Sequence, residues 1–156
     1  MNSSSAIPSD AMFKHILLAT DGSTASDNAA RIAADLARTH GATLTALYVI
    51  EPYPYLHVGE ASAVGFQAYM SDASQAAVRA HTKVAALCES GAPVTLRTRS
   101  VEDPSACNGI VKSAKELGAD LVVVGSHGRS GIPRLMLGSV AAQVVAQSAV
   151  PVLVAR

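Results

Sequence analysis

The sequence predicts one α/β domain built on an open five-stranded parallel sheet with helices on both faces. Short apolar segments of strand length alternate with longer alanine-rich segments of helical period along the chain. Right-handed crossovers turn this alternation into a parallel sheet that is covered on both sides. The chain has 156 residues, 49% hydrophobic and 15% charged, so it can bury one sizeable core but has little room for a second domain.

Five segments have the composition of strands. Three are short apolar runs, typical of strands buried on both faces, and a fourth apolar run lies at the end of the chain. The remaining segment alternates apolar and polar residues, which suits an edge strand with one solvated face. In chain order the expected strands are FKHILLA at 13–19, LTALYVI at 44–50, VTLRTRS at 94–100, DLVVVG at 120–125 and PVLVA at 151–155.

Four segments between these strands have helical spacing of their apolar residues. Gly41 and Gly118 follow the first and third of them and are typical C-terminal caps. Gly91 and Pro93 end the second. The expected helices cover residues 23–39, 71–90, 104–117 and 139–148.

Residues 51–70 have no clear period and contain three of the four tyrosines. This composition predicts a long loop before the second helix. Such a loop is either a lid or partner surface, or an insertion whose aromatic side chains only pack on the domain.

The balance of charge argues against several classes of partner. Twelve basic and twelve acidic side chains give a formal net charge of zero, so we expect no nucleic acid and no membrane as partner. No apolar run approaches the roughly 18 residues that a membrane span needs, and the first residues do not resemble a signal peptide, which favours the cytoplasm. Residues 1–11 are expected to be a disordered tail before a domain at 12–156. Cys88 and Cys107 are too isolated to indicate a disulfide framework or a zinc site.

The strongest local signal is a glycine-rich connection between the fourth strand and the last helix. Gly125 and Gly128 follow the strand, and Gly138 and Ser139 open the helix. A strand, a glycine turn and a helix N-terminus together favour phosphate binding, because free backbone N–H groups and the helix dipole attract negative charge. Arg129 and Arg134 lie in this loop, and residues 121–156 contain no carboxylate side chain. The alternative is that the glycines only turn a corner and Ser139 caps its helix.

Asp21 follows the first strand, where neither a P-loop nor a dinucleotide-binding glycine motif is present. A carboxylate there would repel a pyrophosphate, so Asp21 suits ribose hydroxyls or a metal ion shared with phosphate oxygens. The alternative is a turn or cap aspartate. His127 is the one obvious base in the glycine loop, with Ser130 and Ser139 as potential phosphate acceptors. We therefore assign no catalytic residue and expect at most slow phosphate hydrolysis.

Gly125, Gly128, Gly138 and Ser139 fill the pattern G-x2-G-x9-G-[ST]. With the opening FKHILLATDGS and the ending PVLVA, this pattern resembles the universal stress protein family over the segment from Met12 to Arg156. The resemblance implies a Rossmann-like sheet in the order 3-2-1-4-5, with Asp21 and the glycine loop facing one crevice. It also implies the subgroup that binds ATP, with ADP or AMP as alternatives and Mg²⁺ or Mn²⁺ as the accompanying cation.

The resemblance assigns roles to matching positions. Asp21 would contact the ribose or a phosphate-bound cation, the backbone of Val49 would meet adenine, and the glycine loop would hold ribose and phosphates. The full set of implied nucleotide-binding residues is Ala19, Thr20, Asp21, Val49, Gly125, Ser126, His127, Gly128, Arg129, Gly138, Ser139 and Val140.

Three functions follow as hypotheses. The first is an ATP-binding stress-response module in which nucleotide occupancy controls an interaction or a conformation. The second is a slow ATP hydrolase or autophosphorylating protein, and the third is a dimeric interaction protein that binds no nucleotide. A homodimer is expected through strand 151–155, because that apolar strand leaves backbone groups unpaired at a sheet edge and the family's usual dimer contact lies there. The alternative is that neighbouring side chains or the 51–70 segment shield the edge.

Overall fold

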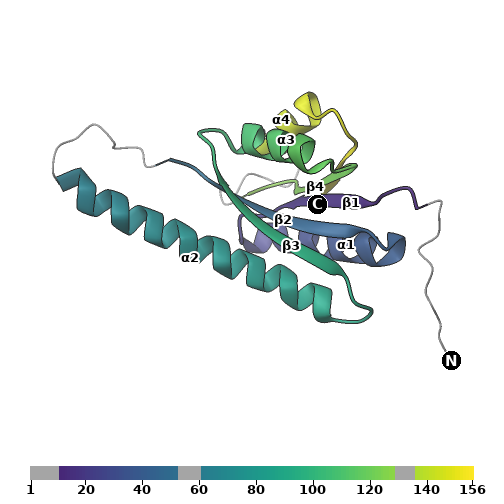
Figure 1. Cartoon of the computed structure of the whole chain (residues 1–156). Helices are drawn as coiled ribbons and strands as arrows, with labels where there is room; N and C mark the ends of the chain where they lie inside the picture. The colour runs from purple at the N-terminus through teal and green to yellow at the C-terminus, as the bar shows by residue number, and fades with distance from the viewer. Residues whose placement is uncertain (1–10, 53–60, 129–135) are drawn as a thin grey trace.

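A computed structural model describes residues 11–52, 61–128 and 136–156 and contains one five-stranded parallel sheet (Figure 1). The sheet order is β3-β2-β1-β4-β5, which confirms the predicted fold class and order. The strands are β1 His15–Ala19, β2 Thr43–Ile50, β3 Thr95–Glu102, β4 Leu121–Gly125 and β5 Val152–Ala155. The helices are α1 Thr24–His40, α2 Ala61–Glu89, α3 Ala106–Leu117 and α4 Ser139–Gln147. Only Ala11 of the expected tail is described, so the domain boundary stays a prediction.

Helices cover both faces of the sheet and enclose two hydrophobic clusters. In Figure 1, α1 and α2 lie on one side and α3 and α4 on the other. Because side chains alternate along a strand, Ile16 and Leu18 of β1 pack in the cluster under α1, whereas Leu17 packs in the cluster under α3 and α4. All three side chains are fully buried. No helix in the described part of the chain is long and apolar enough to cross a membrane.

The C-terminal ends of α1 and α3 confirm the glycine caps that the sequence predicts. Gly41 and Gly118 adopt left-handed backbone angles, with φ of 63° and 64°, directly after α1 and α3. Their N–H groups bond to carbonyls of the preceding turn, which satisfies acceptors that a helix end leaves unpaired. At the other end of α3, the Ser105 side chain accepts a hydrogen bond of 3.2 Å from the Asn108 amide.

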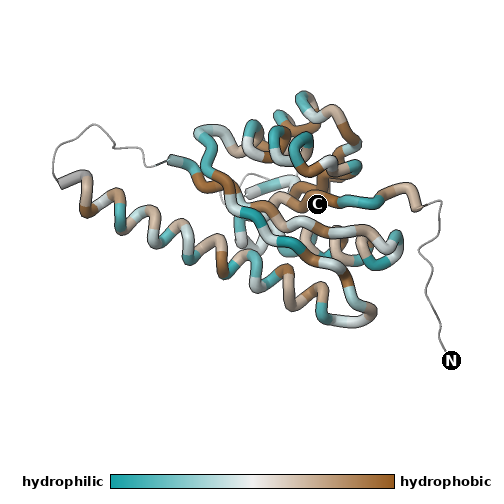
Figure 2. The backbone as a smooth tube through the Cα atoms, viewed as in Figure 1, coloured by the Kyte–Doolittle hydropathy of each residue, from teal (hydrophilic) through white to brown (hydrophobic). Residues whose placement is uncertain are grey.

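The structure corrects the prediction for residues 51–70. Residues 53–60 lie outside the described residues, but 61–70 form the first part of α2, a helix of 29 residues. Tertiary packing explains the difference, because Met70, Ala73 and Ala76 extend one apolar face of the helix onto Tyr48 and Ile50 of β2. In Figure 2, hydrophobic and hydrophilic residues alternate along α2, as in a helix with one buried face.

Arg38 of α1 fixes the C-terminal end of α2. Its guanidinium donates hydrogen bonds of 3.1, 3.0 and 2.9 Å to the carbonyl oxygens of Leu87, Ser90 and Ala92. These carbonyls belong to the last turn of the helix and the chain after it, where backbone acceptors lack helical partners. The opposite end of α2 extends beyond the edge of the sheet (Figure 1).

Candidate functional site

A cavity of about 640 Å³ lies at the carboxyl ends of β1, β2 and β4. This is the switch point of the strand order, where open parallel sheets bind ligands. Of the twelve residues that the sequence singles out for nucleotide binding, all except Arg129 line the cavity. Arg129 lies outside the described residues, as do Ser130 and Arg134.

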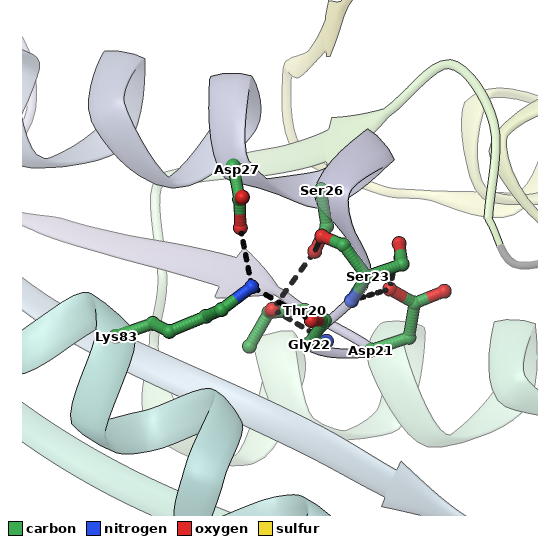
Figure 3. Close-up of polar contacts among 7 residues, drawn as sticks. All are labelled: Thr20, Asp21, Gly22, Ser23, Ser26, Asp27 and Lys83. Atoms are coloured by element: carbon green, nitrogen blue, oxygen red, sulfur yellow. Dashed lines mark hydrogen bonds and ion pairs between the residues drawn. The ribbon is translucent and has the colours of Figure 1, made fainter.

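The turn between β1 and α1, whose polar contacts are drawn in Figure 3, contributes Thr20 and Asp21 to the cavity lining. Asp21 Oδ1 accepts a hydrogen bond of 2.9 Å from the Ser23 amide and one of 2.5 Å from the Ser23 hydroxyl. Gly22 has φ of 75°, and its amide donates to Thr20 Oγ1 over 3.1 Å. Asp21 therefore stabilises the turn, as in the alternative that the sequence left open. It does so through hydrogen bonds that its Oδ1 atom accepts. A β-carbon added to Gly128 would lie 3.0 Å from Asp21 Oδ2, so Asp21 also borders the glycine loop.

Hydrogen bonds hold this turn to the sheet and to α1. The Thr20 amide donates to the Leu47 carbonyl of β2 over 3.0 Å. The Thr20 and Ser26 hydroxyls lie 3.2 Å apart, and Ser26 donates to the Ser23 carbonyl over 2.9 Å. Thr20 and Ser26 are both buried, so these bonds satisfy polar groups that have little access to water. These hydrogen bonds fix the position of the turn against β2 and α1.

Two glycines of the loop are required by the protein's own backbone. A β-carbon on Gly138 would lie 2.8 Å from the Ser126 carbonyl oxygen, to which the Gly138 amide donates over 2.7 Å. One on Gly125 would lie 3.2 Å from the His127 carbonyl oxygen. These close contacts support the alternative that Gly125 and Gly138 allow a tight course of the backbone. It follows that a side chain at Gly138 would displace the loop whether or not a ligand binds there.

The N-terminus of α4 opens into the cavity and has no side-chain cap. The N-cap residue is Gly138, so the alternative that Ser139 caps the helix is wrong. Ser139, Val140 and Ala141 line the cavity, and the first turn contains no acidic residue. The amide of Ala142 is the first to bond back to the Gly138 carbonyl, as expected where the preceding amides lack partners within the helix. This arrangement favours an anionic group at the helix end.

Ser126 and His127 form a polar pair on the cavity wall. Ser126 Oγ and His127 Nδ1 are 2.9 Å apart. The Ser126 amide donates to the Ala155 carbonyl over 2.7 Å, which ties this residue to β5. Ser126 is only 6% exposed, so its position is closely fixed. A hydroxyl beside an imidazole is an arrangement that can transfer a proton.

Sequence reasoning missed the wall that α2 contributes. The cavity residues on this helix recur at intervals of one, three or four positions, which places them along one side; they are Tyr69, Asp72, Ala73, Ala76 and Arg79. The Tyr69 hydroxyl donates to the Glu51 carbonyl over 2.7 Å and connects the wall to the end of β2. Tyr69 lies in the segment that was expected to be a loop, whereas the other four residues lie in the helix expected at 71–90, whose orientation on the sheet cannot be predicted from its periodicity. Tyr48, Ile50 and Glu51 also line the cavity without having been predicted.

Acidic, histidine and cysteine side chains do not form a metal site on their own. Within residues 11–52, 61–128 and 136–156, no group of three or more such side chains could hold a metal ion. Asp21 supplies a single carboxylate, and its Oδ1 already accepts two hydrogen bonds. A cation here would need oxygen ligands from a bound molecule. Cys88 and Cys107 are free and buried.

The family model described as the universal stress protein family matches residues 12–156. A universal stress protein of Methanocaldococcus jannaschii is 34% identical over 146 residues, which cover 93% of this chain and 83% of the relative. One from Thermus aquaticus is 34% identical over 149 residues, which cover 93% of this chain and 100% of the relative.

Solved structures of similar proteins have the same fold. The universal stress protein UspA from Lactobacillus plantarum is 28% identical with a TM-score of 0.71, and the match covers 92% of this chain and 97% of that one. A universal stress protein in complex with cAMP is 26% identical with a TM-score of 0.61, at the same coverage of both chains.

Proposed function

The chain belongs to the universal stress protein family, and we propose that it binds an adenine nucleotide, with ATP as the main ligand and ADP or AMP as alternatives. The observation that carries this proposal is the uncapped N-terminus of α4, which opens into a 640 Å³ cavity at the sheet's switch point. The similar universal stress protein in complex with cAMP supports the choice of an adenine nucleotide.

The two ends of the cavity differ in polarity in the way that a nucleotide requires. Ile50, Ala73 and Ala76 form an apolar wall where β2 meets α2, which suits the faces of an adenine ring. The backbone of Val49 lies there for hydrogen bonding to the base edge. Asp21 lies where the ribose would pass between this wall and the α4 N-terminus, and the phosphates would lie at Gly128 and Ser139.

Nucleotide binding would control an interaction or a conformation of the protein, rather than serve mainly as the first step of ATP hydrolysis. A ligand that binds only the folded state stabilises it by RT ln(1 + [L]/Kd), about 2.7 kcal/mol at a hundredfold excess over Kd. Tyr69, Asp72 and Arg79 place α2 in contact with the ligand, so occupancy would be transmitted to a helix that extends beyond the sheet. We propose a cytoplasmic stress-response module of this kind, with Mg²⁺ or Mn²⁺ held through the nucleotide phosphates and Asp21.

The direct test is to purify the protein gently, denature it and identify released nucleotides by mass spectrometry. Thermal unfolding with ATP, ADP and AMP then measures the preference. Gly128→Val is the cavity-blocking variant, because among the described residues a β-carbon there meets the Asp21 side chain and no backbone atom. Ala142→Val is the matched control, since Ala142 is exposed on α4 and does not line the cavity. We expect ATP to raise Tm in the wild type and the control but not in Gly128→Val. No nucleotide in the preparation and no rise of the wild-type Tm would exclude this function and favour the interaction protein.

A second candidate function is slow phosphoryl transfer, which the 2.9 Å Ser126–His127 pair favours. His127 would accept the Ser126 proton while the hydroxyl oxygen attacks the γ-phosphorus of ATP and ADP leaves. Incubation with γ-labelled ATP followed by peptide mapping tests this function. Label on Ser126 that is lost in Ser126→Ala but kept in Ser139→Ala would support it, whereas an unlabelled protein would leave binding as the function.

A further inference from the structure

A second, smaller cleft opens beside the nucleotide cavity. It measures about 420 Å³ and is lined by Asp21, Gly22 and Ser23 of the β1–α1 turn and by Ala76, Arg79, Ala80 and Lys83 of α2. Asp21, Ala76 and Arg79 line both spaces. A group attached to the part of a ligand that lies at Asp21 can therefore extend into this side cleft.

Close packing fixes the side cleft at its base. A β-carbon on Gly22 would lie 3.1 Å from the β-carbon of Ala80, so α2 rests directly on the turn. Lys83 Nζ donates to the Gly22 carbonyl over 3.1 Å and pairs with Asp27 Oδ1 at 3.2 Å (Figure 3). These contacts place a half-exposed ammonium group on the lining of the cleft and connect α2 to the β1–α1 turn.

Arg79 supplies the second cation. It makes no hydrogen bond or ion pair with any residue in the three ranges that the structure describes, although it lines both spaces. A guanidinium group presents paired N–H donors that match the oxygens of a phosphate. Asp21 lies on the same cleft, with Oδ1 engaged by Ser23.

We propose that the side cleft binds a phosphate on the 2′ or 3′ oxygen of the ribose, with Arg79 as the principal contact and Lys83 as a further cation on the cleft lining. The chain would then take ribose-phosphorylated adenine nucleotides in preference to the matching nucleotides without that phosphate. This inference rests on the proposed nucleotide site with its ribose at Asp21. In dinucleotide-binding sheets an acidic residue binds the free ribose hydroxyl, whereas a nearby arginine accommodates a 2′-phosphate. Here both residue types line one cleft.

The charges that line the side cleft make the preference for a ribose phosphate depend mainly on Arg79. Asp27 offsets the charge of Lys83, and the Asp21 carboxylate repels a phosphate. Without Arg79, Lys83 is the cation left among the described residues that line the cleft, and Asp27 offsets its charge. Replacing Arg79 should therefore abolish the preference for the additional phosphate.

Isothermal titration calorimetry with AMP, adenosine 2′,5′-bisphosphate and adenosine 3′,5′-bisphosphate tests the inference. We expect one bisphosphate to bind the wild type about tenfold more tightly than AMP, and the two isomers show which oxygen carries the phosphate. In Arg79→Gln the bisphosphate should bind no better than AMP. Arg97→Gln is the control for net charge, since Arg97 is exposed on β3 and lines neither space.

The outcomes separate the two proposals. If AMP binds and neither bisphosphate binds more tightly, the side cleft is not a phosphate site and the nucleotide site stands. An unchanged preference in Arg79→Gln also overturns the inference. If none of the three nucleotides binds, the nucleotide site fails and this inference fails with it.

Discussion

Val49 and Gly109 set the distance between β2 and α3. A β-carbon on residue 109 would lie 2.9 Å from both γ-carbons of Val49. The Val49 side chain is therefore used in packing against α3, while its backbone remains on the cavity wall. The close approach of α3 thus helps to shape the part of the cavity assigned to adenine.

Gly109→Ala should destabilise the protein. The clash costs about 1–3 kcal/mol, which exceeds the gain of about 1 kcal/mol that alanine brings to a helix interior. In a Val49→Ala background the clash is removed and the helix propensity remains, so the same change should become neutral or stabilising. Urea unfolding of the four proteins in this cycle measures the coupling. Independent, additive effects would show that α3 relaxes away from β2 without cost.

Asp21→Asn and Asp21→Ala should separate the turn role from the ligand role. Asparagine keeps an oxygen that can accept from Ser23, so Tm of the nucleotide-free protein should change little. Its lost charge should weaken ATP binding about tenfold in the presence of Mg²⁺. Alanine should in addition lower the free energy of unfolding by about 1 kcal/mol. Equal ATP affinity in the wild type and Asp21→Asn would confine Asp21 to the turn.

Homodimerisation through β5 remains a prediction, and the structure improves its test. The carbonyls of Pro151 and Ala155 bond to β4, so by alternation the Val154 amide points away from the sheet. Val154→Pro removes this donor, whereas Val154→Ala keeps it. We expect light scattering to show a dimer for the wild type and for Val154→Ala, and a weaker dimer for Val154→Pro. A Leu153→Lys variant is less suitable, because Leu153 packs against the core. A monomeric wild type would remove this interface.

Stability should fall in mild acid because of His81. Its Nε2 atom is buried without a hydrogen-bond partner in the described chain, and burial lowers its pKa below the ordinary 6.5, although backbone groups of Arg99 and Ala46 oppose the shift. The unfolded chain therefore takes up a proton at a higher pH than the folded one. The stabilisation is complete above the unfolded pKa and is lost as pH falls through the folded pKa. His81→Leu should flatten the dependence of the free energy of unfolding on pH in this window, and an unchanged slope would contradict the assignment.

The sequence predicted the sheet and the sides of the candidate site that the β1–α1 turn and the glycine loop form, because these depend on short, local signals. Apolar runs marked the strands, and the glycine pattern marked the loop between β4 and α4. The first turns of α2 were missed because Gly65 and the aromatic residues weaken the helical signal there, and packing on Tyr48 and Ile50 decides the conformation. Asp72 and Arg79 were missed for a related reason, since only the orientation of α2 brings them to the cavity. The backbone contact at Gly138 was not predictable from spacing alone.

Because α2 is held mainly at its C-terminal half, the free energy of local unfolding should increase along the helix from its N-terminal end. Arg38 and the Gly22–Ala80 contact hold its C-terminal half, which also contains the buried residues Val84 and Cys88. In the first turns, by contrast, Val64 is 77% exposed and Phe66 is 38% exposed. Amide hydrogen exchange should therefore be fast near residue 64 and slow steadily toward residue 88. A bound nucleotide would extend the slowly exchanging part of α2 toward Tyr69. The exchange rates along this helix would then report whether the nucleotide site is occupied.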